Sequence, residues 1–229
     1  QIKLLSERVI KHKENTQTEE ATKTALIMPL LQTLGYDVFD PTEVVPEYTC
    51  DLGIKKGEKI DYAIHKDGQP IILIECKHWK EDLTSHNGQV FRYFHVSNAR
   101  FGILTNGIIY RFYTDLVEKN KMDEKPLFEF NMEKYRESQV DKLREFHKSY
   151  FDVDTILNTA SELKFTNEIR NAIDREINNP SDEFVKYFAR PIYPGRFNDV
   201  VMGQFRAIVK QAFVQYTNDY INERLKSAI

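Results

Sequence analysis

The chain has 229 residues, of which 41% are hydrophobic and 29% charged, enough for one large domain or a domain with a helical appendage. Its net charge of −3 does not suggest a general polyanion binder, so any contact with nucleic acid requires local positive charge or metal ions. Two cysteines, Cys50 and Cys76, are too few for a disulfide framework and indicate a reducing, cytoplasmic environment. No apolar run approaches the roughly 20 residues of a membrane span, and no signal peptide is visible, so no membrane association is expected.

The first predicted helix begins at Thr16 or Thr18. Glu19 and Glu20 fall in its first turn, where carboxylates interact favourably with the helix dipole. Pro29 interrupts the helical spacing of apolar residues and is expected to kink the helix or shorten its regular part. Short segments with β propensity, separated by prolines, follow this helix.

A β-hairpin is predicted next. Residues 59–66 alternate between polar and apolar, Asp67 and Gly68 indicate a turn, and residues 71–77 form the second strand. That second strand begins with four aliphatic residues, which is typical of a strand buried on both faces. A carboxylate and an ammonium group at its end are therefore unusual, because a buried charge without a partner costs several kcal/mol.

The remaining predicted elements are a helix from Thr84 or Ser85 to about Ser97, two strands over 101–115 around an Asn106-Gly107 turn, a strand near 127–130, and helices at 133–148, 161–178, 181–189 and 198–228. This order predicts an α/β fold in which a mixed β-sheet core flanked by helices, residues 1–150, precedes an all-helical C-terminal region, residues 151–229. At 1.5 Å per residue the last helix would extend roughly 45 Å, which suggests a contact in a homodimer.

The charged residues of the hairpin form the candidate catalytic site. With a three-residue loop, Asp61 would share a face with Glu75, with Cβ atoms roughly 4.5 to 8 Å apart. A two-residue loop would place Asp61 on the opposite face. Lys77 lies two residues beyond Glu75 and therefore on the same side of the strand. Two carboxylates can bind Mg²⁺, with Mn²⁺ as a substitute, and the metal can activate water while Lys77 orients or deprotonates that water or neutralises developing charge.

A structural ion pair among the same three residues is the alternative interpretation. Gln89 and Tyr93 lie four residues apart on a predicted helix and so share one face, where they serve either the site or simple packing. A compact basic cluster, Lys55, Lys56 and Lys59, is either a solvated loop or a phosphate contact.

Five segments carry a resemblance to a known family: EEATKTALIMPLLQTLGYDVFDPTEV, EKIDYAI, DGQPIILIECK, QVFRY and ILTNGIIYRFY. Over about residues 19–113 the chain resembles the PD-(D/E)xK nuclease superfamily, and within it the N-terminal nuclease domain of type I restriction enzyme R subunits. The aspartate of the family motif matches Asp61, its glutamate and lysine match Glu75 and Lys77, and its QxxxY element matches Gln89 and Tyr93.

The resemblance implies a restriction-endonuclease-like fold and Mg²⁺-dependent hydrolysis of DNA phosphodiester bonds, leaving 5′-phosphates, in a restriction or phage-defence system. It implies DNA, and restriction-system subunits, as partners. It also implies that the backbone carbonyl of Cys76 and a glutamate of the first helix, Glu19 or preferably Glu20, are further metal ligands. Ile60 replaces the proline of the family motif.

One part of the R subunits, the ATP-driven translocase, has no counterpart in the sequence. No G-x-x-x-x-G-K-[ST] loop is present, and the segment GIKKGEK at 53–59 has the wrong spacing. The chain is therefore expected to be a stand-alone relative or a fragment. An alternative function is a catalytically idle DNA-binding or assembly module that needs a partner motor or specificity subunit.

Overall fold

The computed structural model describes residues 1–49, 59–85 and 88–227. The predicted loop at 53–57, its two lysines and Cys50 lie outside the described residues. No helix in the described part of the chain combines the length and apolarity that crossing a membrane requires.

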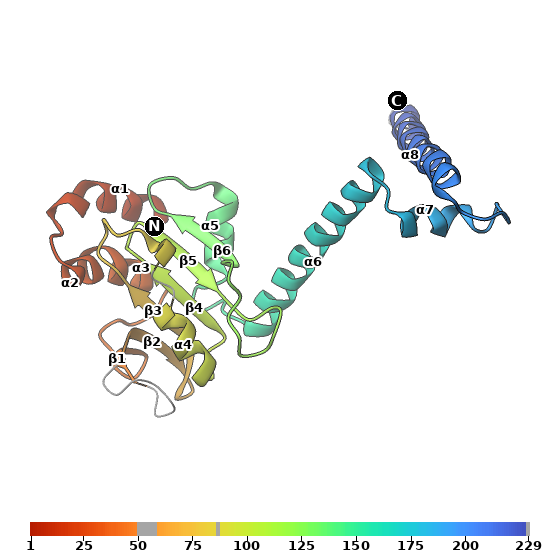
Figure 1. Ribbon diagram of the computed structural model, residues 1–229. Coiled ribbons are helices and arrows are strands. Elements are labelled where there is room, and N and C mark those ends of the chain that lie inside the picture. The colour runs from red at the N-terminus through yellow and green to blue at the C-terminus, as the bar shows by residue number, and fades with distance from the viewer. Residues whose placement is uncertain (50–58, 86–87, 228–229) are drawn as a thin grey trace. The chain divides into compact units, whose positions relative to one another are not determined.

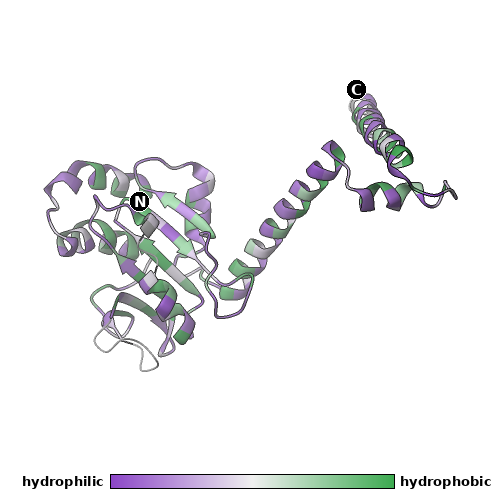
Figure 2. Ribbon diagram, viewed as in Figure 1, coloured by the Kyte–Doolittle hydropathy of each residue, from purple (hydrophilic) through white to green (hydrophobic). Residues whose placement is uncertain are grey.

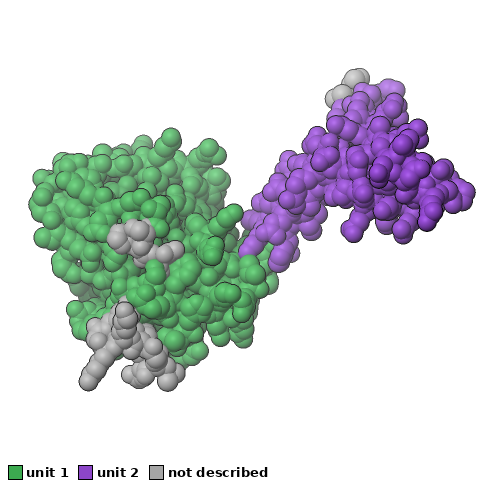
Figure 3. All heavy atoms as spheres, viewed as in Figure 1, with its two compact units in different colours: residues 1–161 green, residues 162–229 purple. Residues whose placement is uncertain are grey.

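The chain divides into two compact units, residues 1–161 and 162–229, coloured separately in Figure 3. The division falls within a single long helix, α6 (Val153–Asn178). The domain boundary predicted at residue 150 stays a prediction.

Unit 1 is built on a six-stranded mixed sheet in which the strands lie side by side in chain order (Figure 1). The strands are β1 (Val44–Tyr48), β2 (Ile60–Lys66), β3 (Gln69–Cys76), β4 (Phe101–Thr105), β5 (Ile109–Tyr113) and β6 (Phe128–Asn131). Neighbouring strands are antiparallel except β3 and β4, which are parallel and are joined through a helical crossover. The predicted α/β fold with a mixed sheet is confirmed.

Helices precede, interrupt and follow the sheet. They are α1 (Ile2–His12), α2 (Glu19–Thr22), α3 (Met28–Thr33), α4 (Gly88–Val96), α5 (Glu137–Arg144), α6, α7 (Asp182–Ala189) and α8 (Asp199–Ser227), with short turns η1 (Lys13–Asn15), η2 (Lys23–Ile27) and η3 (Leu83–Ser85). The predicted helices differ at their ends, since α5 is shorter than 133–148 and α6 begins before residue 161. α1 was not predicted from the sequence.

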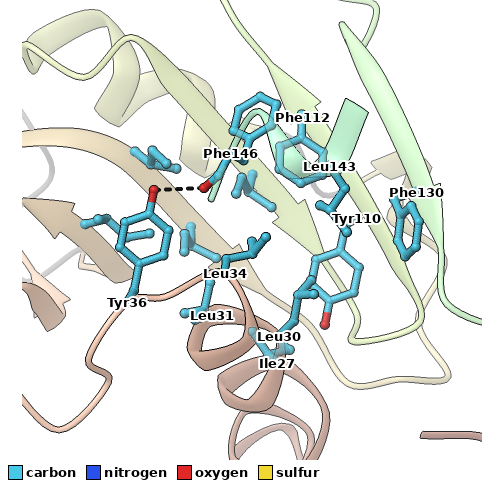
Figure 4. Packing of buried hydrophobic residues seen from close by; sticks show 14 of the residues in the cluster. Ile27, Leu30, Leu31, Leu34, Tyr36, Tyr110, Phe112, Phe130, Leu143 and Phe146 are labelled. Carbon is cyan, nitrogen blue, oxygen red and sulfur yellow. Dashed lines mark hydrogen bonds between the residues drawn. The ribbon is translucent and has the colours of Figure 1, made fainter. Parts of the chain in front are cut away.

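Two hydrophobic clusters cover the two faces of the sheet. Along β3, Ile72 and Ile74 contribute to the first core cluster, which contains buried residues of α1, α3 and α5. Leu73 points to the second core cluster, which contains buried residues of α4. In Figure 2 the middle of β3 and most of β4 are hydrophobic, as expected for strands buried on both faces. In the first cluster the hydroxyl of Tyr36 donates to the carbonyl of Phe146 at 2.9 Å (Figure 4).

The β2–β3 hairpin reaches the predicted register by a different route from the one expected. Its loop has two residues, Asp67 and Gly68, both with positive φ, rather than three. A β-bulge follows, because His65 pairs with Pro70 whereas Ile64 pairs with Ile72. The extra residue on β3 shifts the register by one, and continuing it past the pair Tyr62 and Ile74 sets Asp61 opposite Glu75. The sequence left both loop lengths open; the loop has two residues, and the bulge gives the register that a three-residue loop would have given.

The helix that was predicted to begin at Thr16 or Thr18 begins at Glu19. Thr18 caps it by accepting a hydrogen bond from the backbone N–H of Ala21 at 3.1 Å. The helix then widens into the π-helical turn η2, in which the N–H of Met28 bonds to the carbonyl of Lys23 five residues earlier. This irregularity immediately precedes Pro29, which cannot donate a backbone hydrogen bond, so the predicted disruption takes the form of a π turn.

Unit 2 contains α7, α8 and most of α6. Ser181 caps α7 as predicted, accepting from the N–H of Phe184 at 3.2 Å. Val185, Met202 and Val209 form a small buried hydrophobic cluster in this unit. Many other apolar residues of α7 and α8 are therefore exposed.

The Asn106-Gly107 turn joins β4 to β5 as predicted and packs against the π turn η2. Gly107 has a φ of +81°, and a Cβ there would lie 2.7 Å from Cβ of Leu26. Gly68, in the β2–β3 turn, has a similar φ of +74° but nothing within 4 Å of that position. Replacing each glycine with alanine therefore allows the cost of backbone strain, present at both positions, to be measured apart from the cost of overpacking, present only at Gly107.

We expect Gly107→Ala to lower the free energy of unfolding by about 2–4 kcal/mol, because it combines left-handed backbone strain with overpacking. Gly68→Ala, as the control, should cost only about 1–2 kcal/mol from the backbone alone. Urea denaturation of both variants checks this, and equal costs would contradict the packing of the turn against Leu26.

Candidate active site

Asp61 lies near the start of β2 and joins three segments of unit 1. Its Oδ2 accepts a hydrogen bond from the backbone N–H of Cys76 at 2.7 Å, across the hairpin. Its Oδ1 lies 2.6 Å from Nζ of Lys23, in the π turn η2. The carboxylate is therefore fixed from two sides at the end of β3.

Glu75 is the most deeply buried carboxylate of the site, with 2% of its surface exposed. Oε1 accepts a hydrogen bond from Nζ of Lys77 at 2.6 Å, whereas Oε2 has no hydrogen-bond partner among the described residues. Burial, assisted by the negative charge of Asp61, raises the pKa of Glu75 to about 7 against the opposing effect of Lys77. An unpaired buried carboxylate oxygen costs free energy unless a proton or a cation satisfies it.

Lys77 directly follows β3, and its N–H donates to the carbonyl of Thr105 at 2.8 Å, which extends the pairing with β4. Burial lowers the pKa of Lys77, but the hydrogen bond to Glu75 and nearby carboxylates outweigh it, so the pKa is raised overall. Lys77 is therefore a cation at neutral pH. That charge suits hydrogen-bond donation and charge neutralisation better than the alternative role of deprotonating water.

Gln89 and Tyr93 lie on α4, on the second core cluster's side of the sheet. Nε2 of Gln89 donates to the backbone carbonyl of Lys59, two residues before Asp61. Tyr93 is fully buried in the second core cluster. The structure thus brings Asp61, Glu75 and Lys77 together, places Gln89 against the chain that leads into Asp61, and gives Tyr93 a packing position beneath β3.

The donor atoms fit a magnesium ion. Mg²⁺ typically binds through one or two carboxylates and keeps several waters, and Asp61 and Glu75 provide two, one with an unpaired oxygen. The side chain of Cys76 is buried in the first core cluster, and its backbone carbonyl as a ligand stays a prediction. Across residues 1–49, 59–85 and 88–227, no three His, Cys, Asp or Glu side chains form a ready-made metal cluster.

Glu19 and Glu20, both in α2, differ in their surroundings. Glu20 is 78% exposed at its side chain and lies 2.7 Å from Nζ of Lys23. Glu19 lies 3.6 Å from the same nitrogen, and its charge contributes to the raised pKa values of both Glu75 and Lys77. The choice of Glu20 as a ligand stays a prediction.

Lys23 belongs to this cluster but was not predicted from the sequence. The signal was present, because Lys23 follows Glu19 by four residues and Glu20 by three, the spacings of helical ion pairs. Such pairs are usually solvent-exposed, and nothing local shows that this one is turned inward to Asp61. The segment after Lys77 also contacts the chain just before α2, since Nε1 of Trp79 donates to the carbonyl of Thr16 at 2.8 Å.

Comparison with known proteins found one matching family. Residues 18–127, just under half of the chain, match the family model of the type I restriction enzyme R protein N terminus. The match includes all of the predicted site residues and confirms the resemblance to the N-terminal nuclease domain of R subunits. It supports a nuclease-like role at the level of the family. Searches among curated proteins and among solved structures found no match.

The raised pKa of Glu75 predicts a pH dependence of folding in metal-free buffer. Between about pH 4.5 and 7 the folded protein retains a proton that the unfolded chain releases, so the free energy of unfolding decreases as the pH rises through this window. The slope from this one group is at most about 1.4 kcal/mol per pH unit. We expect Glu75→Gln to remove this component, so that its free energy of unfolding changes less than that of the wild type between about pH 4.5 and 7.

Urea denaturation at several pH values measures this difference. Glu118→Gln, which alters an exposed carboxylate paired with Lys121, is the control and should follow the wild-type profile. Parallel profiles for the wild type and Glu75→Gln would show that Glu75 ionises as an ordinary carboxylate.

Proposed function

We propose that the chain is a Mg²⁺-dependent deoxyribonuclease of a cytoplasmic restriction system that acts in phage defence, hydrolysing DNA phosphodiester bonds to leave 5′-phosphates. The observation that carries the proposal is the buried carboxylate of Glu75, with one oxygen unpaired, opposite Asp61 and bonded to Lys77. A structural ion pair with Lys77 accounts for Oε1 of Glu75 only. A bound cation would also account for the burial of Oε2, which has no hydrogen-bond partner among the described residues. The family match supports a nuclease-like role and, as partners, DNA and restriction-system subunits.

Asp61, Glu75 and the backbone carbonyl of Cys76 would hold the metal, and a bound Mg²⁺ would supply Lewis acidity and lower the pKa of a coordinated water. Glu75 fixes the ammonium of Lys77 at 2.6 Å. Lys77 donates hydrogen bonds to the attacking water or to a phosphate oxygen and offsets the negative charge that develops there. The N–H of Cys76 keeps the carboxylate of Asp61 in one orientation.

Gln89 acts as a positioning residue. Its hydrogen bond to the carbonyl of Lys59 holds the chain at the entry to β2 against α4. Because Asp61 follows two residues later, this contact restricts where that carboxylate can lie. Tyr93 supports the same helix from within the second core cluster.

We further propose that two copies associate through α7 and α8. These helices form a groove lined by apolar side chains, among them Phe188, Ile192, Ile208 and Tyr216. A homodimer would cover this surface and would supply two nuclease sites for cutting both strands.

Light scattering at tens of micromolar tests the association. The wild type should have the mass of a dimer, and Ile208→Glu should be a monomer because it places a charge in the groove. Leu163→Glu, on an exposed position of α6, should leave the dimer intact. A monomeric wild type would exclude this proposal.

The catalytic proposal predicts that Lys77→Ala slows cleavage of supercoiled plasmid with Mg²⁺ or Mn²⁺ by about 100- to 1,000-fold, the usual effect of losing one charge-stabilising donor. Folding and DNA binding, followed by circular dichroism and fluorescence anisotropy, should remain close to wild type. Lys121→Ala, which removes an exposed lysine paired with Glu118, should cleave normally.

Equal cleavage by the wild type and Lys77→Ala would refute the assignment of the site. DNA binding without cleavage by any of the three proteins, together with no binding of Mn²⁺ in calorimetry, would favour the idle assembly module instead.

A further inference from the structure

Lys23 is a buried cation for which the proposed reaction has no use. Only 8% of its surface is exposed, and its ammonium lies among three carboxylates. Nζ is 2.6 Å from Oδ1 of Asp61, 2.7 Å from Oε1 of Glu20 and 3.6 Å from Oε1 of Glu19. Since a buried cation requires partners, these contacts explain why Lys23 can lie here, but not what it does.

The local backbone directs Lys23 towards the site. Lys23 is the first residue of the π turn η2, and π turns occur often at functional sites. Asp61 is held on its other oxygen by the N–H of Cys76. Lys23 is therefore the movable partner of this carboxylate, and the backbone amide is the fixed one.

The charges around Lys23 are not balanced. The cluster contains four carboxylates and two ammonium groups, so it lacks two positive charges when all six groups are ionised. One divalent cation would supply that difference. Such a cation on Asp61 would also repel the ammonium of Lys23, since the two would share one carboxylate.

Lys23 has an alternative position within reach. Glu20 and Glu19 precede it by three and four residues on the same helix, and Glu20 already contacts the ammonium. A lysine has a flexible four-carbon side chain, so its ammonium can leave Asp61 and stay paired with these two carboxylates. Movement towards Glu20 also takes the charge towards solvent, because that side chain is 78% exposed.

We propose that Lys23 is an exchangeable counter-cation of the metal site. Its ammonium neutralises Asp61 in the metal-free protein, withdraws to Glu20 and Glu19 when a divalent cation binds, and thereby sets the affinity of the site for metal. The inference rests on the proposed function, because it assumes that Asp61 is a metal ligand. It gives Glu20 a role in receiving Lys23, distinct from ligating the metal.

The test is a calorimetric titration of the whole chain with Mn²⁺ in the absence of DNA. Lys23→Met removes the competing charge and keeps a side chain of similar length, and we expect about tenfold tighter binding of Mn²⁺. Lys142→Met is the matched control, because Lys142 is also a largely buried lysine paired with a glutamate three residues away. Its affinity for Mn²⁺ should equal that of the wild type.

A second variant tests the inference if Lys23→Met does not fold. Lys23→Arg keeps the charge but can bind Asp61 through two parallel hydrogen bonds. It should therefore weaken binding of Mn²⁺, whereas Lys23→Met strengthens it. Unchanged affinity in Lys23→Arg would overturn the inference.

A double-mutant comparison separates exchange from a general effect of charge. Glu20→Gln should weaken binding of Mn²⁺ when Lys23 is present, because the ammonium loses its alternative position, but should have little effect in the Lys23→Met background. Equal weakening in both backgrounds would mean that Glu20 acts on the metal itself and would overturn the exchange.

Failure of the inference and failure of the proposed function give different results. If the wild type binds Mn²⁺ and Lys23→Met binds it equally or more weakly, only the role of Lys23 is refuted. If neither protein binds Mn²⁺, the metal site of the proposed function is refuted, and the inference with it.

Discussion

The hydrogen bond from the Cys76 amide to Asp61 is the interaction on which the site depends. It connects β2 to the end of β3 and orients one oxygen of Asp61, which leaves the other for the ammonium of Lys23. The π turn η2, strand β2 and the end of β3 thus meet at the carboxylate of Asp61. Glu75 lies beside this junction with its charge incompletely satisfied. A fold stabilised only for its own sake would gain more from apolar residues at these positions, because buried ion pairs seldom stabilise more than well-packed hydrophobic residues do.

The backbone irregularities of unit 1 lie where they affect this junction. The bulge at Ile64 and His65 changes the register of the hairpin, so that Asp61 faces Glu75 despite a two-residue turn. The π turn η2 lies between α2 and α3 and directs Lys23 inward. The bulge adds one residue to β3, and the π turn spans one residue more than a regular helical turn. Irregularities of both kinds recur next to functional sites. Regular elements of the same length would separate the charges that the structure brings together.

Much of this arrangement was predictable from the sequence. An apolar run ending in Glu75 and Lys77 identifies a buried strand with two charges, and the aspartate one hairpin earlier completes the set. The Asn106-Gly107 turn and the cap at Ser181 follow from local chemistry alone. The bulge was not predictable, because it adds a residue to β3, where the continuous apolar run of residues 71–74 shows no alternation from which the register follows. Lys23 was missed because its spacing from Glu19 and Glu20 is equally typical of an exposed helix face, and only tertiary packing decides between the two.

The Asn106-Gly107 turn also has a consequence for the order in which the unit can assemble. The side-chain amide of Asn106 donates to the carbonyls of Trp79 and Glu81, just beyond Lys77, while Gly107 packs against Leu26. The segment that carries Lys77 is therefore fixed only after a later hairpin and an earlier helix have both docked onto it. Contacts between such distant parts of a chain require the closure of long loops, which slows their formation. The charged site is thus expected to be completed late, and a growing chain would not present all of its charged groups together before the sheet around them has closed.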